Sequence, residues 1–142
     1  MKVLFIAGFG PIARDVETSR LLYEDALGIT FKVEDGDYRH TEDLAGAKGF
    51  AVWPLAQAAE SCFGTEAWPA DLAVPQAWLE FDVEDVAEAT REMEGRGYRL
   101  LVANRTEPWG QVVSRLLSPE GLLVGLTMTP WMREGNGGGG GN

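Results

Sequence analysis

The sequence contains little cysteine and no long apolar run, and each shortage excludes a class of protein. The one cysteine, Cys62, excludes an internal disulfide framework. No base or positive charge flanks it in AESCFGTE to activate its thiol, so we expect a small buried apolar residue. No apolar stretch approaches the ~20 residues that span a bilayer, and the opening run MKVLFIAGFGP is too short for a signal peptide. We therefore expect a cytoplasmic protein that has no membrane partner.

Positive charge is also scarce. The 142 residues include 12 Lys and Arg against 22 Asp and Glu, which gives a net charge of −10. Nucleic-acid backbones and anionic membranes bind clusters of Lys and Arg, so neither is an expected partner. The acidity favours a cationic partner or ligand, unless it serves only to keep the protein soluble.

The single histidine leaves few routes to metal or nucleophilic catalysis. His40 lies in DYRHTED beside Glu42 and Asp43, and one imidazole with surface carboxylates makes a weak metal site. Ser–His–Asp catalysis would have to use the same residue, and no nucleophile motif accompanies it. We therefore expect His40 to be a solvated loop residue, and we expect no metal centre.

What the sequence does contain is one pattern that occurs twice. ARDVETSRLLYEDALGITF and VEDVAEATREMEGRGYRL align so that Asp15 meets Asp85, and Gly28 meets Gly97 after a one-residue gap. Each copy predicts an amphipathic helix that begins after the Asp and ends at the Gly. Each helix is expected to pack its apolar face on a sheet. Each copy also follows a β-prone run, KVLFIAGF or AWLEFDV.

Further strands are expected after each helix. Residues 28–33 and 48–55 have strand character in the first half, and YRLLVANRT, GQVVSRLLS and LLVGLTMTP have it in the second half. Between the halves, AQAAESCFGTEAWPADLAVP is expected to be a loop, either a linker or a flap over a site.

The order β-α-β-β-β therefore occurs twice, which predicts an α+β fold in one domain over residues 1–131. Module one covers residues 1–60, a linker covers residues 61–75, and module two covers residues 76–131. The Gly-rich residues 132–142 are expected to form a disordered tail. Each module alone would leave one face of its sheet bare, so the two sheets are expected to pair and curve around a shared cavity as one mixed sheet.

Alternation along the strands indicates which residues face that cavity, because successive side chains point to opposite faces. Leu79, Phe81 and Val83 alternate onto the face that packs on the helix. The cavity then receives the other set from this strand and the corresponding set from LLVGLTMT: Trp78, Glu80, Asp82, Leu123, Gly125, Thr127 and Thr129.

Five motifs stand in a fixed order along residues 1–131: LLYEDALGI, LEFDVEDV, RGY, EPWGQ and LSPEGLLVGLT. In this order they resemble the vicinal-oxygen-chelate superfamily, the family of glyoxalases, bleomycin-resistance proteins and extradiol dioxygenases. The resemblance implies two βαβββ modules around a shared cavity. It implies less about activity, because function varies widely within this superfamily.

The resemblance also indicates where a metal would bind. Metal-dependent members place ligands at four equivalent strand positions, usually His on the first strand of each module and Glu on the last. These positions fall here on Gly8, Trp53, Trp78 and Gly125. Glycine has no side chain, and an indole N–H has no lone pair for a metal. The resemblance therefore points to a metal-free branch without a cofactor, in which two tryptophans wall the cavity and two glycines leave room opposite them.

Glu80 is the candidate catalytic residue. Desolvation between indoles would raise its pKa and make it a general base, or a counter-charge for a cationic ligand, unless it forms an ion pair with Arg115. Trp109, in the turn EPWG, is either a lid or a packed turn aromatic. The full set of candidate ligand-binding residues is Trp53, Trp78, Glu80, Trp109, Arg115 and Thr127.

The expected function is small-molecule binding of the bleomycin-resistance type. An aromatic or cationic ligand would be held between tryptophans and sequestered, as in drug resistance, by a homodimer. The alternative is an enzyme of the glyoxalase or dioxygenase type. It would be a metal-independent isomerase or lyase with Glu80 as its base, or a metalloenzyme whose ligands lie elsewhere. A domain that only dimerises or regulates a partner is the third possibility.

Overall fold

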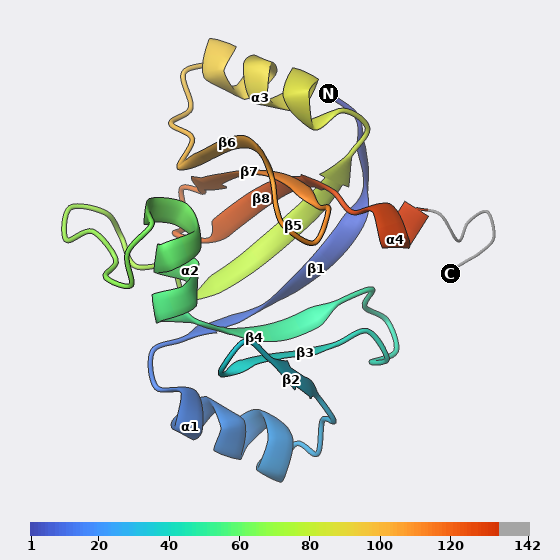
Figure 1. The fold of residues 1–142 in the computed structure, drawn as a ribbon, viewed down its shortest axis with the longest axis vertical. Helices are drawn as coiled ribbons and strands as arrows, with labels where there is room; N and C mark the ends of the chain where they lie inside the picture. Colours follow the sequence, from blue (N-terminus) through green and yellow to red (C-terminus); the bar gives the residue numbers. More distant parts are fainter. Residues whose placement is uncertain (134–142) are drawn as a thin grey trace.

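The computed structural model describes residues 1–133 of the chain and shows one curved sheet flanked by helices (Figure 1). The strands are β1 (Val3–Ala13), β2 (Lys32–Glu34), β3 (Tyr38–Thr41), β4 (Phe50–Pro54), β5 (Ala77–Val83), β6 (Val102–Thr106), β7 (Val112–Leu117) and β8 (Leu123–Met128). The helices are α1 (Val16–Arg20), its π-helical continuation η1 (Leu21–Ala26), α2 (Leu55–Phe63), α3 (Val86–Gly95) and α4 (Pro130–Arg133). Within residues 1–133, no helix has the length and apolar character needed to cross a membrane.

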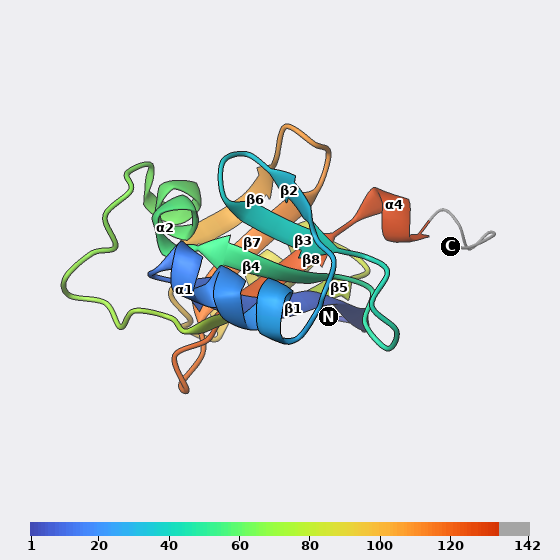
Figure 2. The same cartoon turned by 90° about the horizontal axis from the view of Figure 1, so that it is seen from below.

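The strands lie in the order β2-β3-β4-β1-β5-β8-β7-β6. The first and last strands of each module pair in parallel, β1 with β4 and β5 with β8, and the remaining pairs are antiparallel. The pair of β1 and β5 joins the modules and places Gly8 opposite Glu80. Figure 2 shows the edge strands β2 and β6 on the same side of this central pair, so the sheet is strongly curved. The predicted α+β fold of two βαβββ modules is confirmed.

Both repeated helices begin as predicted. The carboxylate of Asp15 accepts a hydrogen bond from the Thr18 amide at 3.2 Å, and that of Asp85 accepts one from the Glu88 amide at 3.1 Å. These bonds satisfy first-turn N–H groups that have no partner within the helix. Gly97, which follows the second helix, has a φ of 90°, a left-handed conformation that glycine adopts without steric cost.

The two helices differ in how they pack. In α3, Val86 and Ala89 lie in a core cluster with Val83 of β5 and Leu126 of β8. The helix α1 and its continuation η1 contain no buried residue. The expectation of a buried apolar face on the first helix is therefore wrong. Leu21 and Leu22 of η1 are exposed instead, as is Leu27, which follows it.

The predicted loop between the modules begins with a helix, α2, which follows Pro54 directly. Its buried side includes Ala58, Ala59 and Cys62, at helical spacing, and it ends at Gly64 with a φ of 79°. The expected strand 48–55 accordingly ends one residue early, at Pro54. The expectation of a buried Cys62 is confirmed.

The C-terminal boundary also shifts. Residues 132 and 133, assigned from the sequence to the Gly-rich tail, belong to α4. The rest of that predicted tail, 134–142, lies outside the described residues.

Candidate functional site

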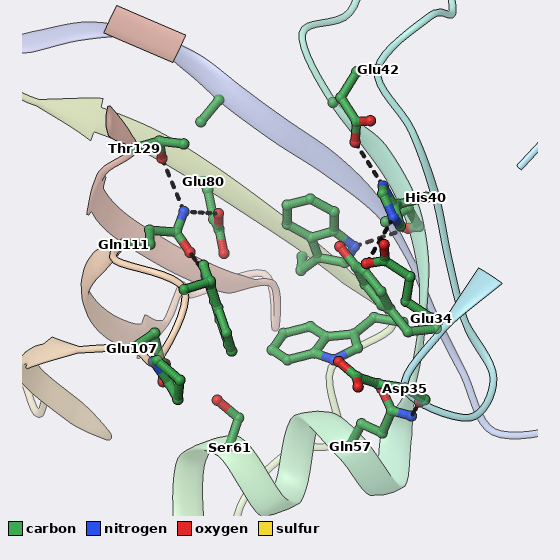
Figure 3. Close-up of a pocket in the computed structure, with 18 of the residues that line it drawn as sticks. Glu34, Asp35, His40, Glu42, Gln57, Ser61, Glu80, Glu107, Gln111 and Thr129 are labelled. Atoms are coloured by element: carbon green, nitrogen blue, oxygen red, sulfur yellow. Dashed lines mark hydrogen bonds and ion pairs between the residues drawn. The ribbon is translucent and has the colours of Figure 1, made fainter. Parts of the chain in front are cut away.

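A cavity of about 960 Å³ lies inside the curve of the sheet. Side chains from both modules line it, and α2 supplies residues on one side, among them Gln57 and Ser61 (Figure 3). Trp131 and Met132 of α4 line it as well. Five Tyr and Trp side chains line it, one each from β3, β4, β5, the turn between β6 and β7, and α4: Tyr38, Trp53, Trp78, Trp109 and Trp131. The structure therefore brings together the aromatic wall that the sequence predicted, and it adds Tyr38 and Trp131.

Trp78 projects into the cavity side of β5, as its alternation predicted. Its indole N–H donates to the carbonyl oxygen of Ala51 at 3.0 Å, and its ring meets that of Trp53 edge to face with centroids 6.4 Å apart. A Cβ placed on Gly8 would lie 2.9 Å from the tip of the Trp78 ring. The expectation of open room at Gly8 is therefore wrong, because the indole occupies it.

Glu80 fills the space at the second glycine in the same way. A Cβ on Gly125 would lie 2.9 Å from Cγ of Glu80. The Glu80 carboxylate accepts a hydrogen bond from Gln111 Nε2 at 3.3 Å and lies 3.5 Å from the Arg115 guanidinium. Burial raises the pKa of Glu80, and the charge of Arg115 opposes that rise. Glu80 thus lines the cavity and also makes the ion pair that the sequence left as its alternative role.

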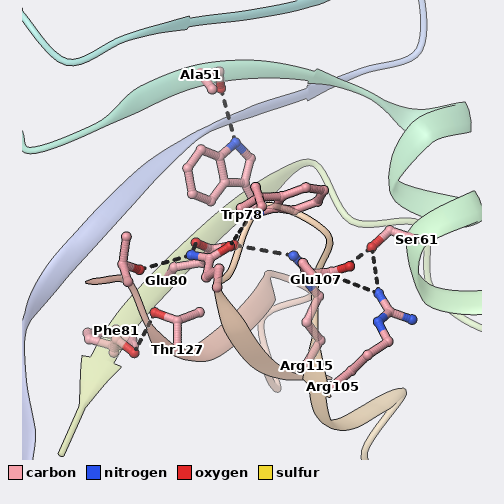
Figure 4. A network of polar contacts seen from close by, with 12 residues as sticks. Ala51, Ser61, Trp78, Glu80, Phe81, Arg105, Glu107, Arg115 and Thr127 are labelled. Carbon is pink, nitrogen blue, oxygen red and sulfur yellow. Dashed lines mark hydrogen bonds and ion pairs between the residues drawn. The ribbon is translucent and has the colours of Figure 1, made fainter. Parts of the chain in front are cut away.

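Arg115 is buried and pairs with two carboxylates that line the cavity, those of Glu80 and Glu107 (Figure 4). Its guanidinium lies 3.6 Å from Glu107, donates to Ser61 Oγ at 3.0 Å, and stands 5.2 Å from the centre of the Trp53 ring. Arg105 donates to Ser61 and Glu107 as well. The positive charge in this cavity is therefore already compensated by protein carboxylates.

Two other predicted residues occupy different environments. Trp109 is 57% exposed, lines the cavity mouth, and donates its indole N–H to Gln111 Oε1 at 3.2 Å. It is not a packed turn residue. Thr127 is fully buried and does not line the cavity, since its hydroxyl donates to Asp82 Oδ1 at 2.5 Å. The prediction that Thr127 contacts a ligand is wrong, because the neighbouring carboxylate takes its hydroxyl.

His40 is not a solvated loop residue. It lies in β3, lines the cavity, and stacks on Tyr38 with ring centroids 5.3 Å apart. Its Nδ1 lies 2.7 Å from Glu42, and its Nε2 lies 3.2 Å from Glu34. The alternation Tyr38–His40 along one strand could have placed both rings on the same face.

The cavity carries an excess of negative charge. Burial, together with the charge of Glu80, raises the pKa of the Tyr38 phenol. Two arginines line the cavity, and both are paired within module two. Six acidic residues line it: Glu34, Asp35, Glu42, Glu60, Glu80 and Glu107. Four of them are outside the arginine pairs, so the local field favours a cation.

Several lining residues were missed from the sequence. Gln57, Glu60 and Ser61 come from α2, whose spacing of small apolar residues after Pro54 was the available signal. Gln111 follows the turn that carries Trp109, and nothing in the local sequence indicates its role as a hydrogen-bond centre.

The residues at the four family metal positions do not fit a metal. Gly8 and Gly125 offer no ligand atom, and the space over them holds Trp78 and Glu80. The Trp78 indole nitrogen is a donor committed to a backbone carbonyl. Across residues 1–133, no group of three or more His, Cys, Asp or Glu side chains is arranged to hold a metal ion.

Comparison with known proteins agrees with this architecture. The family model described as "Glyoxalase/Bleomycin resistance protein/Dioxygenase superfamily" matches residues 9–126. No curated protein matches the chain. A superfamily member from Vibrio splendidus 12B01 aligns with a TM-score of 0.55 and 15% identity, over 85% of this chain and 96% of that one.

Two further solved structures show the same fold. Methylmalonyl-CoA epimerase from Streptomyces coelicolor aligns with a TM-score of 0.54 and 16% identity, over 90% of this chain and 99% of that one. A hypothetical protein from Bacillus halodurans C-125 aligns with a TM-score of 0.56 and 13% identity, over 87% and 93%. At these identities the likeness is one of fold alone.

Proposed function

The chain belongs to the glyoxalase/bleomycin resistance protein/dioxygenase superfamily, and from that membership we propose that it binds an aromatic or cationic small molecule without a metal. The observation that carries the proposal is the filling of the family metal positions by Trp78 and Glu80 beside a cavity of about 960 Å³. The volume suits a small organic ligand. The walls offer flat rings, and the excess carboxylates offer negative charge.

The expected affinity comes from rings and charge together. An aromatic ligand would gain about 0.5–1.5 kcal/mol from each ring pair beyond its buried area. A cation over an indole or phenol face would gain roughly 0.5–2 kcal/mol more. Arg115 already covers one ring, that of Trp53, so a ligand cation would use the rings of Tyr38, Trp78 or Trp131.

A matched pair of probes tests this proposal: the cation N-methylquinolinium and the similar ring 2-methylquinoline at a pH where it is uncharged. Both are expected to quench tryptophan fluorescence saturably, and the cation should bind about 2- to 30-fold more tightly. Trp131→Phe should reduce the quenching. Trp68→Phe is the control, because Trp68 packs on Phe63 outside the cavity lining. Absence of saturable quenching, or a stoichiometric divalent metal in the purified protein, would contradict the proposal.

The mode of action follows from the same proposal. A protein that binds without chemistry would act by sequestering its ligand in the cytoplasm, as drug-resistance proteins do. We expect it to do so as a homodimer, and the exposed apolar residues of module one support this. Phe9 of β1 and Tyr23 of η1 both contact Phe50, so β1 and η1 share one apolar surface. Leu22, next to Tyr23 in the sequence of η1, is half exposed. Sedimentation should show a dimer that Leu22→Glu weakens.

A second candidate is a metal-independent isomerase or lyase in which Glu80 removes a proton. The observation that favours it is a buried carboxyl in the cavity whose pKa burial raises. One structure of the same fold is an epimerase. Glu80→Gln separates the two functions, because it should abolish turnover if Glu80 is a base. It should only weaken binding of N-methylquinolinium if Glu80 is a counter-charge.

A further inference from the structure

Two tryptophans stand at the mouth of the cavity on segments with little packing of their own. Trp109 lies in the turn between β6 and β7, and Trp131 lies in α4, a four-residue helix without a buried residue. They are 57% and 49% exposed. About half of each residue is exposed, so apolar burial constrains these rings only in part, and polar contacts of the same segments can add to it.

Three hydrogen bonds connect Trp109 with Asp82. The indole N–H of Trp109 donates to Gln111 Oε1 at 3.2 Å. Gln111 Nε2 donates to Thr129 Oγ1 at 2.9 Å (Figure 3). The Thr129 hydroxyl donates in turn to Asp82 Oδ1 at 2.8 Å. Gln111 and Thr129 are buried, and Asp82 has no exposed surface.

The same carboxylate holds both ends of α4. Asp82 Oδ2 accepts from the backbone amide of Thr129, just before the helix, at 2.9 Å. It also accepts from Nε of Arg133, the last residue of the helix, at 3.0 Å. Arg133 donates a second bond to the carbonyl oxygen of Val83. Trp131 lies between these two anchors.

The chain can run in one direction only. An indole N–H is a donor without acceptor capacity, and an ionised carboxylate is an acceptor without a proton. With a donor fixed at one end and an acceptor at the other, the Gln111 amide and the Thr129 hydroxyl each have one orientation that satisfies every bond. If a donor stood in place of the Asp82 carboxylate, the Thr129 hydroxyl would have to accept from it and donate to Gln111. The Gln111 amide would then have to turn over, and its NH₂ group would face the Trp109 N–H, which is also a donor.

We propose that Asp82 and Gln111 are positioning residues that hold Trp109 and Trp131 at the cavity mouth through this chain. Gln111 also donates to Glu80 Oε1 at 3.3 Å, so these hydrogen bonds connect Glu80 inside the cavity with Trp109 at its mouth. The role in ligand retention rests on the proposed function. The role in positioning the two tryptophans does not.

Indole N–H resonances of ¹⁵N-tryptophan-labelled protein test the positioning without a ligand. Thr129→Val removes the hydroxyl at nearly constant volume, so the Trp109 resonance should shift and exchange faster with solvent. Thr129→Ser restores the hydroxyl and should restore the resonance. Trp68 and Trp78 are internal controls, because they donate to the carbonyls of Ala73 and Ala51.

A second variant tests Asp82, the final acceptor of this series of hydrogen bonds. Asp82→Asn cannot accept every bond that the carboxylate accepts, so the resonances of both Trp109 and Trp131 should move. The proposal is overturned if the Trp109 resonance stays in place in Thr129→Val and in Asp82→Asn. It is also overturned if Thr129→Ser moves that resonance as far as Thr129→Val does, or if Trp68 and Trp78 move equally in Thr129→Val.

The ligand-dependent part has a separate readout. Stopped-flow dissociation of N-methylquinolinium should be several-fold faster in Thr129→Val than in Thr129→Ser, with a smaller change in the association rate. Equal dissociation rates in the two variants would overturn the retention role and leave the positioning role to the spectra. A failure of the proposed function itself would differ, because the probe would then bind neither variant nor the unaltered protein.

Discussion

The two modules share one strand order, and in each the first helix begins at a capping Asp, yet the modules differ in which side chains those helices bury. In module two, Val86 and Ala89 of α3 pack against the sheet, and Arg115 is buried between two carboxylates. In module one, α1 and η1 contain no buried residue. There the strands come close through glycines instead. A Cβ on Gly10 of β1 would lie 1.9 Å from the carbonyl oxygen of Ala51 in β4.

The difference shows that a repeated sequence pattern specifies an element but not what the element packs against. Module two gains stability from side-chain burial, which mutations can remove in steps. Module one also buries core side chains, among them Ile12, Val52 and Ala58, but at Gly10 its strands β1 and β4 approach so closely that an added atom meets fixed backbone. Paired substitutions at matched places in the two modules can therefore break or sharpen the comparison.

The largest contrast is expected between two arginines. Arg115→Met leaves Glu80 and Glu107 buried without their shared cation and should lower the free energy of unfolding by about 3–5 kcal/mol. Arg39→Met in module one removes a pair with Glu24 nearer the surface and should cost about 1 kcal/mol. Urea denaturation measures both. Equal losses would show that module two does not depend on its buried charges.

Two glycines give the next contrast. Gly10→Ala should cost about 3 kcal/mol or more, because its methyl group would meet backbone atoms of β4. Gly125→Ala should cost about 1 kcal/mol, since its nearest contact is Cγ of Glu80, a side chain that can turn. Thermal unfolding would rank the two. A Gly125→Ala loss as large as that of Gly10→Ala would show that Glu80 is rigidly held.

The helices supply a third pair, because Val86 and Val16 occupy equivalent places after their capping residues. Val86→Ala removes buried methyl groups from the core of module two and should cost about 2 kcal/mol. Val16→Ala should change stability by less than about 0.5 kcal/mol, since the better helix propensity of Ala offsets a small loss of contact. A similar loss in both variants would contradict the asymmetry.

The ionisation of Glu80 tests module two by pH. Because burial raises its pKa above the usual 4.5, the folded state binds this proton more tightly than the unfolded state does. Its contribution to stability is present below the unfolded pKa and is lost as pH rises through the folded pKa. Relative to Glu80→Gln, the unaltered protein should therefore lose stability with rising pH in that window. A difference that stays constant from about pH 5 to about pH 8 would contradict this.

The fold and part of the site were accessible from the sequence for a physical reason. Alternation along β5 placed Trp78 and Glu80 on the cavity side, because strand period is a local property. Alternation along β8 likewise placed Thr127 on the face that turns toward the cavity, but it could not show that Asp82 would bind its hydroxyl. His40 was misplaced because residues 38–41 were not assigned to a strand, so no alternation was applied to them; this short strand is held by its pairing with β2 and β4, which the local sequence does not specify.

The sequence could not show that neighbouring side chains fill the space beside Gly8 and Gly125, and the reason is different. The sequence showed that Gly8 and Gly125 carry no side chain, but which neighbour fills the space depends on three-dimensional distance. The ring of Trp78 and the chain of Glu80 take it. The missed helix α2 shows the reverse, since its local spacing of Ala58, Ala59 and Cys62 was present and the prolines around it favoured a loop.

The smallest expected effect is the one in which the modules should agree. Asp15→Ala and Asp85→Ala each remove one capping bond, and both should lower the midpoint of thermal unfolding by a similar small amount, less than Val86→Ala does. Hydrogen bonding to Thr18 lowers the pKa of Asp15, so its cap acts above the usual pKa and is lost as pH falls through the lowered value. If Asp85→Ala costs much more than Asp15→Ala, packing of α3 amplifies its cap. The helix signals of the two modules would then be equivalent in sequence but not in energy.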